Sequence, residues 1–144
     1  MKRLCKGFTL IELIMVTAII SILALIAVPS FIQQIKQNRI VSNTNKLHST
    51  YKFARSEAAK RDRLINLDES SGAWQVKLDT EVLFTFSPSH SSISVTGLSD
   101  QTIQATGSTS SANYLITDGD NSTTDYRLCI YISGQSYTTQ DACG

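Results

Sequence analysis

An unbroken apolar run lies near the N-terminus of this chain and limits the folds that the chain can adopt. Residues Phe8 to Val28 read FTLIELIMVTAIISILALIAV, with a single charge at Glu12 and neither glycine nor proline. As an α-helix this run would rise about 31 Å, enough to cross the hydrocarbon core of a bilayer. Lys2, Arg3 and Lys6 precede it, and the positive-inside rule keeps such an end in the cytoplasm. The run therefore predicts a membrane segment.

A secretory signal peptide is the alternative interpretation of this segment. Signal peptides also begin with basic residues, but their apolar core is shorter than this run. No A-x-A-type cleavage site follows Val28. We therefore favour an anchor that stays in the membrane.

Glu12 is unusual in this apolar run, because inserting a charged residue at the centre of a membrane helix costs roughly 2.5–3.5 kcal/mol. Such a residue usually has a partner, yet none of the residues three or four positions away is basic. These residues are Phe8, Thr9, Met15 and Val16. The partner must come from the chain start or from another molecule. A cut after Gly7 would place a new amine on Phe8, one turn from Glu12.

The stretch KGFTLIELIMVTAIISILALIAVPSF resembles the N-terminus of type IV pilins and type II secretion pseudopilins. The resemblance implies that a prepilin peptidase cuts between Gly7 and Phe8 and that Phe8 is N-methylated. It also implies that Glu12 pairs with the terminal amine of a neighbouring subunit, where the two charges offset part of each other's desolvation cost. Residues 1–7 are then a leader, and residues 8–29 form the transmembrane and assembly helix.

The helix is predicted to continue to about Arg61, with a kink or local melting at Pro29 rather than a stop. Apolar or small residues recur with spacings of 4, 3, 4, 3 and 4, which is one face of an amphipathic helix. They are Ile40, Thr44, Leu47, Tyr51, Ala54 and Ala58. Residues 30–62 are therefore expected to pack this face onto a sheet.

The end of this helix, FARSEAAKRDR, is similar to the corresponding stretch of FimT/FimU/GspH-type minor pilins and pseudopilins. Lys60, Arg61 and Arg63 lie near the predicted C-terminus, where cations interact favourably with the helix dipole. A second interpretation stays open, in which this basic ridge contacts a neighbouring subunit or DNA.

Residues 63–144 are predicted to form a β-rich head. Seven short runs, several with strict alternation, are separated by turn residues. The runs are Arg63–Leu67, Trp74–Leu78, Val82–Phe86, Ser92–Thr96, Thr102–Thr106, Asn113–Thr117 and Tyr126–Ile132. Short alternating strands beside one long helix indicate an antiparallel sheet packed on that helix, an α+β fold.

The three cysteines divide between the leader and the head. Cys5 lies in the leader and would leave with it, so that Cys129 and Cys143 remain as an even pair in an oxidising compartment. A bond between them would be worth roughly 3 kcal/mol in the chain-entropy model. It resembles the C-terminal disulfide-bounded loop of many pilins. Two free thiols are the alternative.

Charge and site chemistry exclude several classes of function. Charged residues make up 17% of the chain, and residues 64–144 carry a net −7 against +6 for residues 29–63. This argues against nucleic-acid binding driven by bulk positive charge. His48 and His90 have no nucleophile or metal partner by spacing, so we expect no enzyme, no cofactor and no metal. Asp118–Asp125 is rich in oxygen ligands but lacks the EF-hand spacing for Ca²⁺, which favours a solvated turn.

These features predict a minor pilin, a structural subunit that helps to assemble or initiate a type IV pilus used for motility, adhesion or DNA uptake. Its partners would be other pilin subunits, an inner-membrane assembly platform and a prepilin peptidase. It would span the inner membrane with a periplasmic head before joining a surface pilus. One alternative is a type II secretion pseudopilin of the GspH type. Another is a DNA-binding minor pilin of natural transformation, but no Arg or Lys follows Arg127.

Overall fold

A computed structural model of the chain describes residues 8–144; Gly7 and the rest of the predicted leader lie outside the described residues. One helix, α1 (Leu10–Arg61), is followed by eight strands. The chain divides into two compact units, the first ending at Ile35 and the second spanning Lys36–Gly144. The second unit is called the head below.

In the first unit, α1 is apolar and fully exposed. Every described residue from Phe8 to Ile35 is exposed, and the most apolar window of α1 has a mean hydropathy of 2.7. By length and composition, this is one helix that could cross a membrane. The helix runs through Pro29 without a stop, as predicted.

The C-terminal end of α1 is closed by a left-handed residue. Asp62 has a φ of 51°, and the amide of Arg63 donates to the carbonyl of Ala58 at 3.2 Å. This bond satisfies one of the carbonyls that a helix end leaves unpaired. The predicted end near Arg61 is confirmed.

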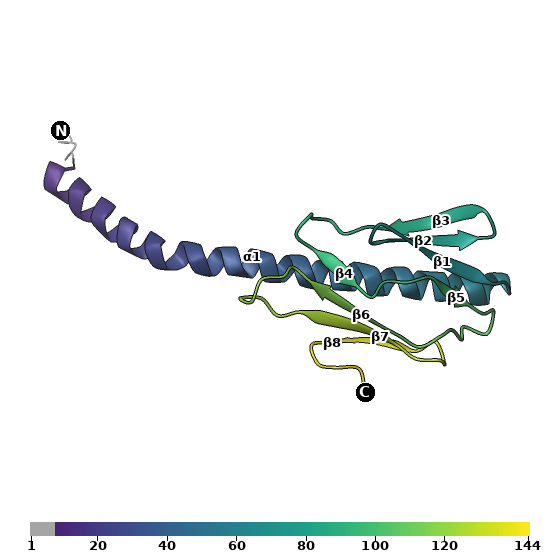
Figure 1. The fold of residues 1–144 in the computed structure, drawn as a ribbon. Helices are drawn as coiled ribbons and strands as arrows, with labels where there is room; N and C mark the ends of the chain where they lie inside the picture. The colour runs from purple at the N-terminus through teal and green to yellow at the C-terminus, as the bar shows by residue number, and fades with distance from the viewer. Residues whose placement is uncertain (1–7) are drawn as a thin grey trace, which may run out of the picture. The chain divides into compact units, whose positions relative to one another are not determined.

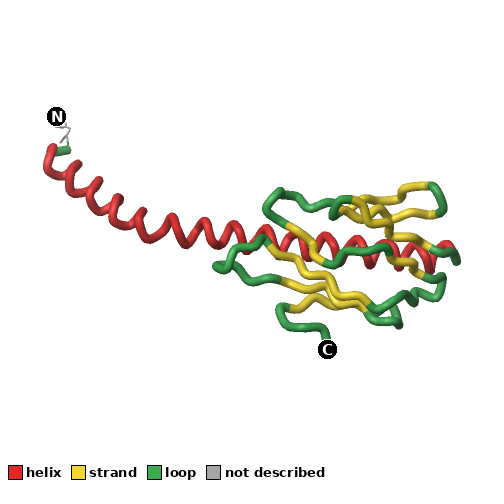
Figure 2. Tube along the Cα trace, in the orientation of Figure 1, coloured by secondary structure: helices red, strands yellow, loops and turns green. Residues whose placement is uncertain are grey.

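The head contains two four-stranded antiparallel sheets rather than the single sheet that the sequence predicted. The strands are β1 (Ile65–Ser70), β2 (Ala73–Leu78), β3 (Glu81–Phe86), β4 (Ser94–Thr96), β5 (Gln101–Ile103), β6 (Ala112–Thr117), β7 (Tyr126–Ile130) and β8 (Ser136–Thr139). The first sheet has the order β3-β2-β1-β5 and the second β4-β6-β7-β8. Both lie along the C-terminal half of α1, on opposite sides of it in the view of Figure 1 and Figure 2.

Local sequence explains the hairpins of the first sheet. Ser71 and Gly72 join β1 to β2, and both have positive φ values, 53° and 77°. Two such residues match the right-handed twist of antiparallel strands. In β2 the alternating residues Trp74, Val76 and Leu78 are buried, as their spacing predicts.

The core of the head lies between α1 and the two sheets. All six residues of the predicted stripe on α1 are buried. The ring of Trp74 in the first sheet meets that of Tyr114 in the second edge to face, with centroids 5.0 Å apart, an arrangement that aromatic pairs prefer. The indole nitrogen of Trp74 donates to the carbonyl of Ser99 at 2.9 Å. The predicted α+β fold is confirmed.

Candidate assembly site and basic surface

The candidate assembly site is the first turn of α1. The amide of Glu12 donates to the hydroxyl oxygen of Thr9 at 3.3 Å, so Thr9 caps the helix that begins at Leu10. Glu12 is then the third helical residue, where a negative charge favours the positive end of the dipole. The T-x-x-E spacing of a capping box is visible in the sequence. We did not predict this capping role of Glu12 from the sequence.

The two residues of the predicted cleavage site are not both described. Gly7 lies outside the described residues, whereas Phe8 is the first described residue and is 83% exposed. Glu12 is also exposed. Both predicted assembly residues are therefore open to a membrane or a neighbouring chain.

The predicted basic ridge is largely neutralised by acids of the same head. The Nε of Arg61 lies 2.7 Å from one carboxylate oxygen of Glu57, and the Nζ of Lys60 lies 3.8 Å from the other. The hydrogen bond from Arg61 holds the pKa of Glu57 below its ordinary value. Arg63 pairs with Asp79 at 2.8 Å. Three cations therefore face two carboxylates, so this cluster of five charged side chains carries a net charge of only +1.

Arg55, in the same basic stretch, donates to backbone carbonyls rather than to a carboxylate. Its Nε donates to the carbonyl of Gly107 at 3.2 Å and an Nη to that of Ser133 at 3.5 Å. The buried Tyr51, one turn earlier, donates to the carbonyl of Gly134 at 3.0 Å. These bonds fasten the β5–β6 connection and the β7–β8 turn to α1. No local pattern in the sequence predicts these bonds, because the partners are backbone atoms far along the chain.

The Asp118–Asp125 loop is closed by its own hydrogen bonds and by α1. One carboxylate oxygen of Asp118 accepts from the amide of Asp120 and from the hydroxyl of Thr123. The Asp120 carboxylate pairs with Lys36, and the hydrogen bond from Lys36 holds the pKa of Asp120 far below its ordinary range. Within residues 8–144, no group of three or more His, Cys, Asp or Glu side chains is placed to hold a metal. These contacts fasten the loop to α1 at Lys36.

His48 lies on α1 and is half-buried against the second sheet. Its Nε2 lies 3.0 Å from the hydroxyl of Ser136 on β8. Burial lowers the pKa of His48. This histidine helps to dock β8 on the helix.

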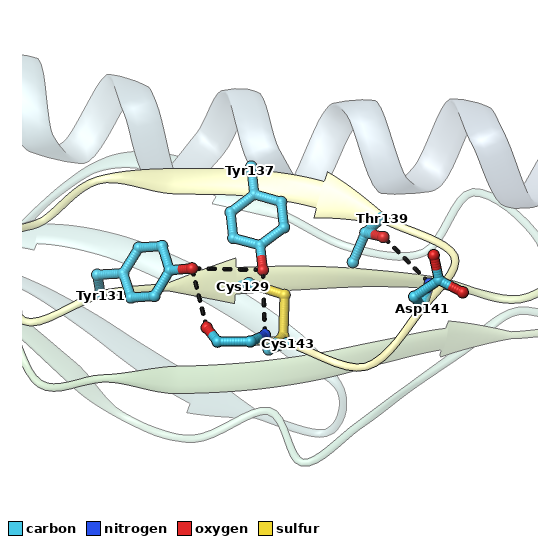
Figure 3. Close-up of a disulfide and its surroundings, with 7 residues drawn as sticks. Cys129, Tyr131, Tyr137, Thr139, Asp141 and Cys143 are labelled. Carbon is cyan, nitrogen blue, oxygen red and sulfur yellow. Dashed lines mark hydrogen bonds between the residues drawn. A yellow bond between two sulfur atoms is a disulfide. The ribbon is translucent and has the colours of Figure 1, made fainter.

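Cys129 and Cys143 form the predicted disulfide, which Figure 3 shows beside two tyrosines. The two Cα atoms are 5.7 Å apart. The rings of Tyr131 and Tyr137 stack with centroids 5.7 Å apart, and the hydroxyl of Tyr131 donates to the carbonyl of Gly144 at 2.9 Å. The C-terminal tail is thereby pinned across the β7–β8 hairpin.

An exposed apolar helix with one carboxylate in its first turn, continuing as the spine of an antiparallel head, defines a type IV pilin-like protein. Residues 2–28 match the prokaryotic N-terminal methylation motif. Residues 43–136 match the family described as type II transport protein GspH. The chain belongs to the GspH family of pilin-like proteins.

Several known proteins are similar to this chain. The type IV minor pilin FimU of Pseudomonas aeruginosa PAO1 has a similar fold, with a TM-score of 0.63 and 16% identity over 69% of this chain and 87% of FimU. The type IV major fimbrial protein FimA of Dichelobacter nodosus is 42% identical over 65 residues, which are 43% of this chain and 41% of FimA. The type IV major pilin PilA of Myxococcus xanthus is 46% identical over 59 residues, 40% of this chain and 26% of PilA. The matched segments thus span well under half of these two relatives, 41% and 26% of their lengths.

Proposed function

We propose that this protein is a minor pilin, a structural subunit that helps to initiate or build a type IV pilus. The observation that carries the proposal is the apolar first part of α1, from Leu10 to Ile35, in which every residue is exposed. An exposed apolar surface of this size needs a membrane or other apolar helices around it. Members of pilin families are structural, non-enzymatic subunits that assemble with other pilin subunits.

The proposed assembly chemistry uses Phe8 and Glu12. A prepilin peptidase cuts after Gly7, and the new amine on Phe8 is methylated. The Glu12 carboxylate then pairs with the terminal amine of a neighbouring subunit as the apolar helix leaves the inner membrane through an assembly platform. Before assembly the head is periplasmic; afterwards it is part of a surface pilus. Ion pairing inside a dry helix bundle offsets part of the desolvation of both charges.

A second candidate function is that of a pseudopilin in type II secretion. The match of residues 43–136 to the GspH family favours it. The disulfide between Cys129 and Cys143, which resembles the C-terminal loop of many pilins, favours the pilus. Deletion of the gene separates these two functions. A minor pilin predicts loss of surface pili with normal protein secretion. A secretion pseudopilin predicts loss of protein secretion with normal surface pili.

The test of the proposed function is whether the chain enters filaments in processed form. Filaments are sheared from cells with an active prepilin peptidase, and the intact mass of this chain is measured. We expect a mass that starts at a methylated Phe8, and no recovery from cells that lack the peptidase. A membrane-bound product that keeps Cys5 in peptidase-competent cells would contradict the proposal.

A further inference from the structure

Two cations on α1 have no carboxylate partner. Among the residues that the structure describes, neither Lys52 nor Arg55 forms an ion pair, whereas five other cations of the head do. These five are Lys36, Lys60, Arg61, Arg63 and Lys77. Lys52 and Arg55 are three positions apart, so they are neighbours on the surface of the helix. Their positive charges are therefore not paired with an acid of the head.

Both cations line one hollow between α1 and the β5–β6 connection. The hollow has a volume of about 310 Å³, and Ser56, Ala59, Thr106 and Gly107 complete its lining. Of the described residues, no acidic one lines this hollow. Pockets for small ligands have volumes of roughly 300–1,000 Å³, so the hollow suits a compact ligand. The charges of its lining favour an anion.

The guanidinium of Arg55 is held in place beside the hollow. Its bonds to the carbonyls of Gly107 and Ser133 fix the side chain but use only part of the N–H donors that a guanidinium carries. An added Cβ at Gly107 would lie 2.9 Å from the Nε of Arg55, so the backbone of the connection lies directly against the guanidinium. An ordered cation with donors to spare loses little entropy when it binds a ligand.

Lys52 and Thr106 add further donors to the hollow. Lys52 is exposed, and its ammonium group carries donors and no acceptor. The hydroxyls of Thr106 and Ser108 lie 2.9 Å apart, and either of them can be the donor, so Thr106 can turn its hydrogen towards a ligand. Burial lowers the pKa of His48, and the charge of Lys52, one turn further along α1, lowers it as well. The positive charge of Lys52 therefore acts on its neighbours.

We propose that this hollow binds a phosphate-class oxyanion, either inorganic phosphate or the phosphate group of a small ester. A guanidinium binds phosphate oxygens through charge-assisted hydrogen bonds, and a lysine ammonium adds a point charge. A tetrahedral group offers oxygens to donors on both sides of the hollow, Lys52 and Arg55 on α1 and Thr106 on the connection. The inference goes beyond the proposed function and does not rest on it.

A bound oxyanion joins two parts of the head that the chain itself connects only through backbone carbonyls. It contacts the cations of α1 and the β5–β6 connection together, so it fastens that connection to the helix. A ligand that binds only the folded state stabilises it by mass action. One such site contacts a single phosphate, whereas tight nonspecific binding of duplex DNA needs several. The site is therefore one for a small anion.

The test is a calorimetric titration of the full-length chain in nonionic detergent with inorganic phosphate, at an ionic strength held constant with chloride. We expect a single saturable site and a rise in the unfolding temperature. Lys52→Gln should weaken the affinity about tenfold or more, because a hydrogen bond to a charged group is lost. Lys52→Arg keeps the charge and should retain binding. Lys60→Gln, two turns further along α1 and outside the hollow, is the matched control and should leave the affinity unchanged.

A second measurement locates the bound anion. Phosphate in the hollow offsets the charge of Lys52, so the pKa of His48 should rise in saturating phosphate. Nuclear magnetic resonance of the imidazole protons measures this pKa in the same full-length chain.

Titration with glycerol phosphate distinguishes the two sources of the phosphate group. Tighter binding of glycerol phosphate than of inorganic phosphate assigns the site to an ester, and equal or weaker binding assigns it to the free ion. Four results would overturn the inference: binding that does not saturate, equal losses in Lys52→Gln and Lys60→Gln, an unchanged pKa of His48, or acetate that binds as tightly as phosphate.

Discussion

The hydroxyl of Tyr51 donates a 3.0 Å hydrogen bond to the carbonyl of Gly134, joining the buried face of α1 to the turn between β7 and β8. Gly134 has a φ of 78° and lies against the backbone of Gly107, whose carbonyl accepts from Arg55. Two helical side chains thus hold two glycine turns from different parts of the head. This junction makes the position of the hairpin depend on α1.

Replacement of Gly134 by alanine should strongly destabilise the head. An added Cβ would lie 1.7 Å from the carbonyl oxygen of Gly107, so backbone must move. We expect a loss of about 3–5 kcal/mol in the free energy of unfolding, measured by urea denaturation of the full chain in detergent. Gly119→Ala is the matched control, because Gly119 also has a positive φ, 71°, but has nothing within 4 Å of an added Cβ. It should cost only about 1–2 kcal/mol, and equal losses for both variants would contradict this explanation.

The stability of the head should fall at high pH because of Tyr51. Burial raises the pKa of Tyr51 to about 12, above its ordinary value of about 10. A raised pKa means that the folded state favours the protonated phenol. The resulting stability is complete below the unfolded pKa and is lost as pH rises from about 10 to 12, by roughly 2–3 kcal/mol.

Tyr51→Phe tests that account, because phenylalanine cannot ionise. The variant should lose about 1 kcal/mol at neutral pH with the hydrogen bond to Gly134, and its unfolding free energy should fall less steeply above pH 10. Burial also raises the pKa of Tyr114, so some slope remains. An unchanged slope in Tyr51→Phe would rule out Tyr51 as its source.

Loss of the disulfide should weaken the head without affecting the apolar helix. Cys129→Ala or Cys143→Ala removes a crosslink that pins the tail, and we expect a loss of about 2–5 kcal/mol. Thermal unfolding under oxidising conditions measures it. Cys5→Ser, in the predicted leader, should leave the processed protein unchanged. Two free thiols in the purified wild-type protein would show that the bond does not form.

Duplex DNA should bind weakly at near-physiological salt. Nonspecific affinity depends on the number of phosphates that free cations contact, and Lys60, Arg61 and Arg63 already face Glu57 and Asp79. A mobility-shift titration measures the affinity. Sub-micromolar binding that weakens steeply with salt, and that is lost when the three cations are neutralised, would place the protein in a DNA-binding class instead.

The sequence predicted the parts of the fold that depend on local periodicity. The stripe on α1 is visible because burial repeats with the helical period, and each of the seven predicted runs overlaps a strand. Strand β8 was missed because Ser136–Thr139 is polar and half-buried, so it has no apolar alternation. The division into two sheets was missed because it depends on pairing between distant strands, such as β1 with β5.

In the candidate sites, too, contacts between residues close in sequence could be predicted, whereas contacts between distant residues could not. The pairs of Glu57 with Lys60 and Arg61 are three and four residues apart on a helix, a spacing that predicts contact. The pair of Arg63 with Asp79 depends on the β2–β3 turn returning to the end of α1, which no local pattern shows. The contact between the rings of Phe53 and Phe84, whose centroids lie 5.8 Å apart, likewise joins two residues that only the tertiary fold brings together.

The proposed function makes this chain a filament subunit that assembles through its apolar N-terminal helix. The decisive measurement is the recovery of Glu12→Ala in sheared filaments relative to wild type, with the amount in the membrane fraction as the control. Removal of the charge lowers the cost of insertion, roughly 2.5–3.5 kcal/mol for a charged residue at a helix centre, so membrane levels should stay at least as high. We predict that the variant accumulates in the membrane and is largely lost from filaments. Wild-type recovery of Glu12→Ala in filaments would contradict the claim.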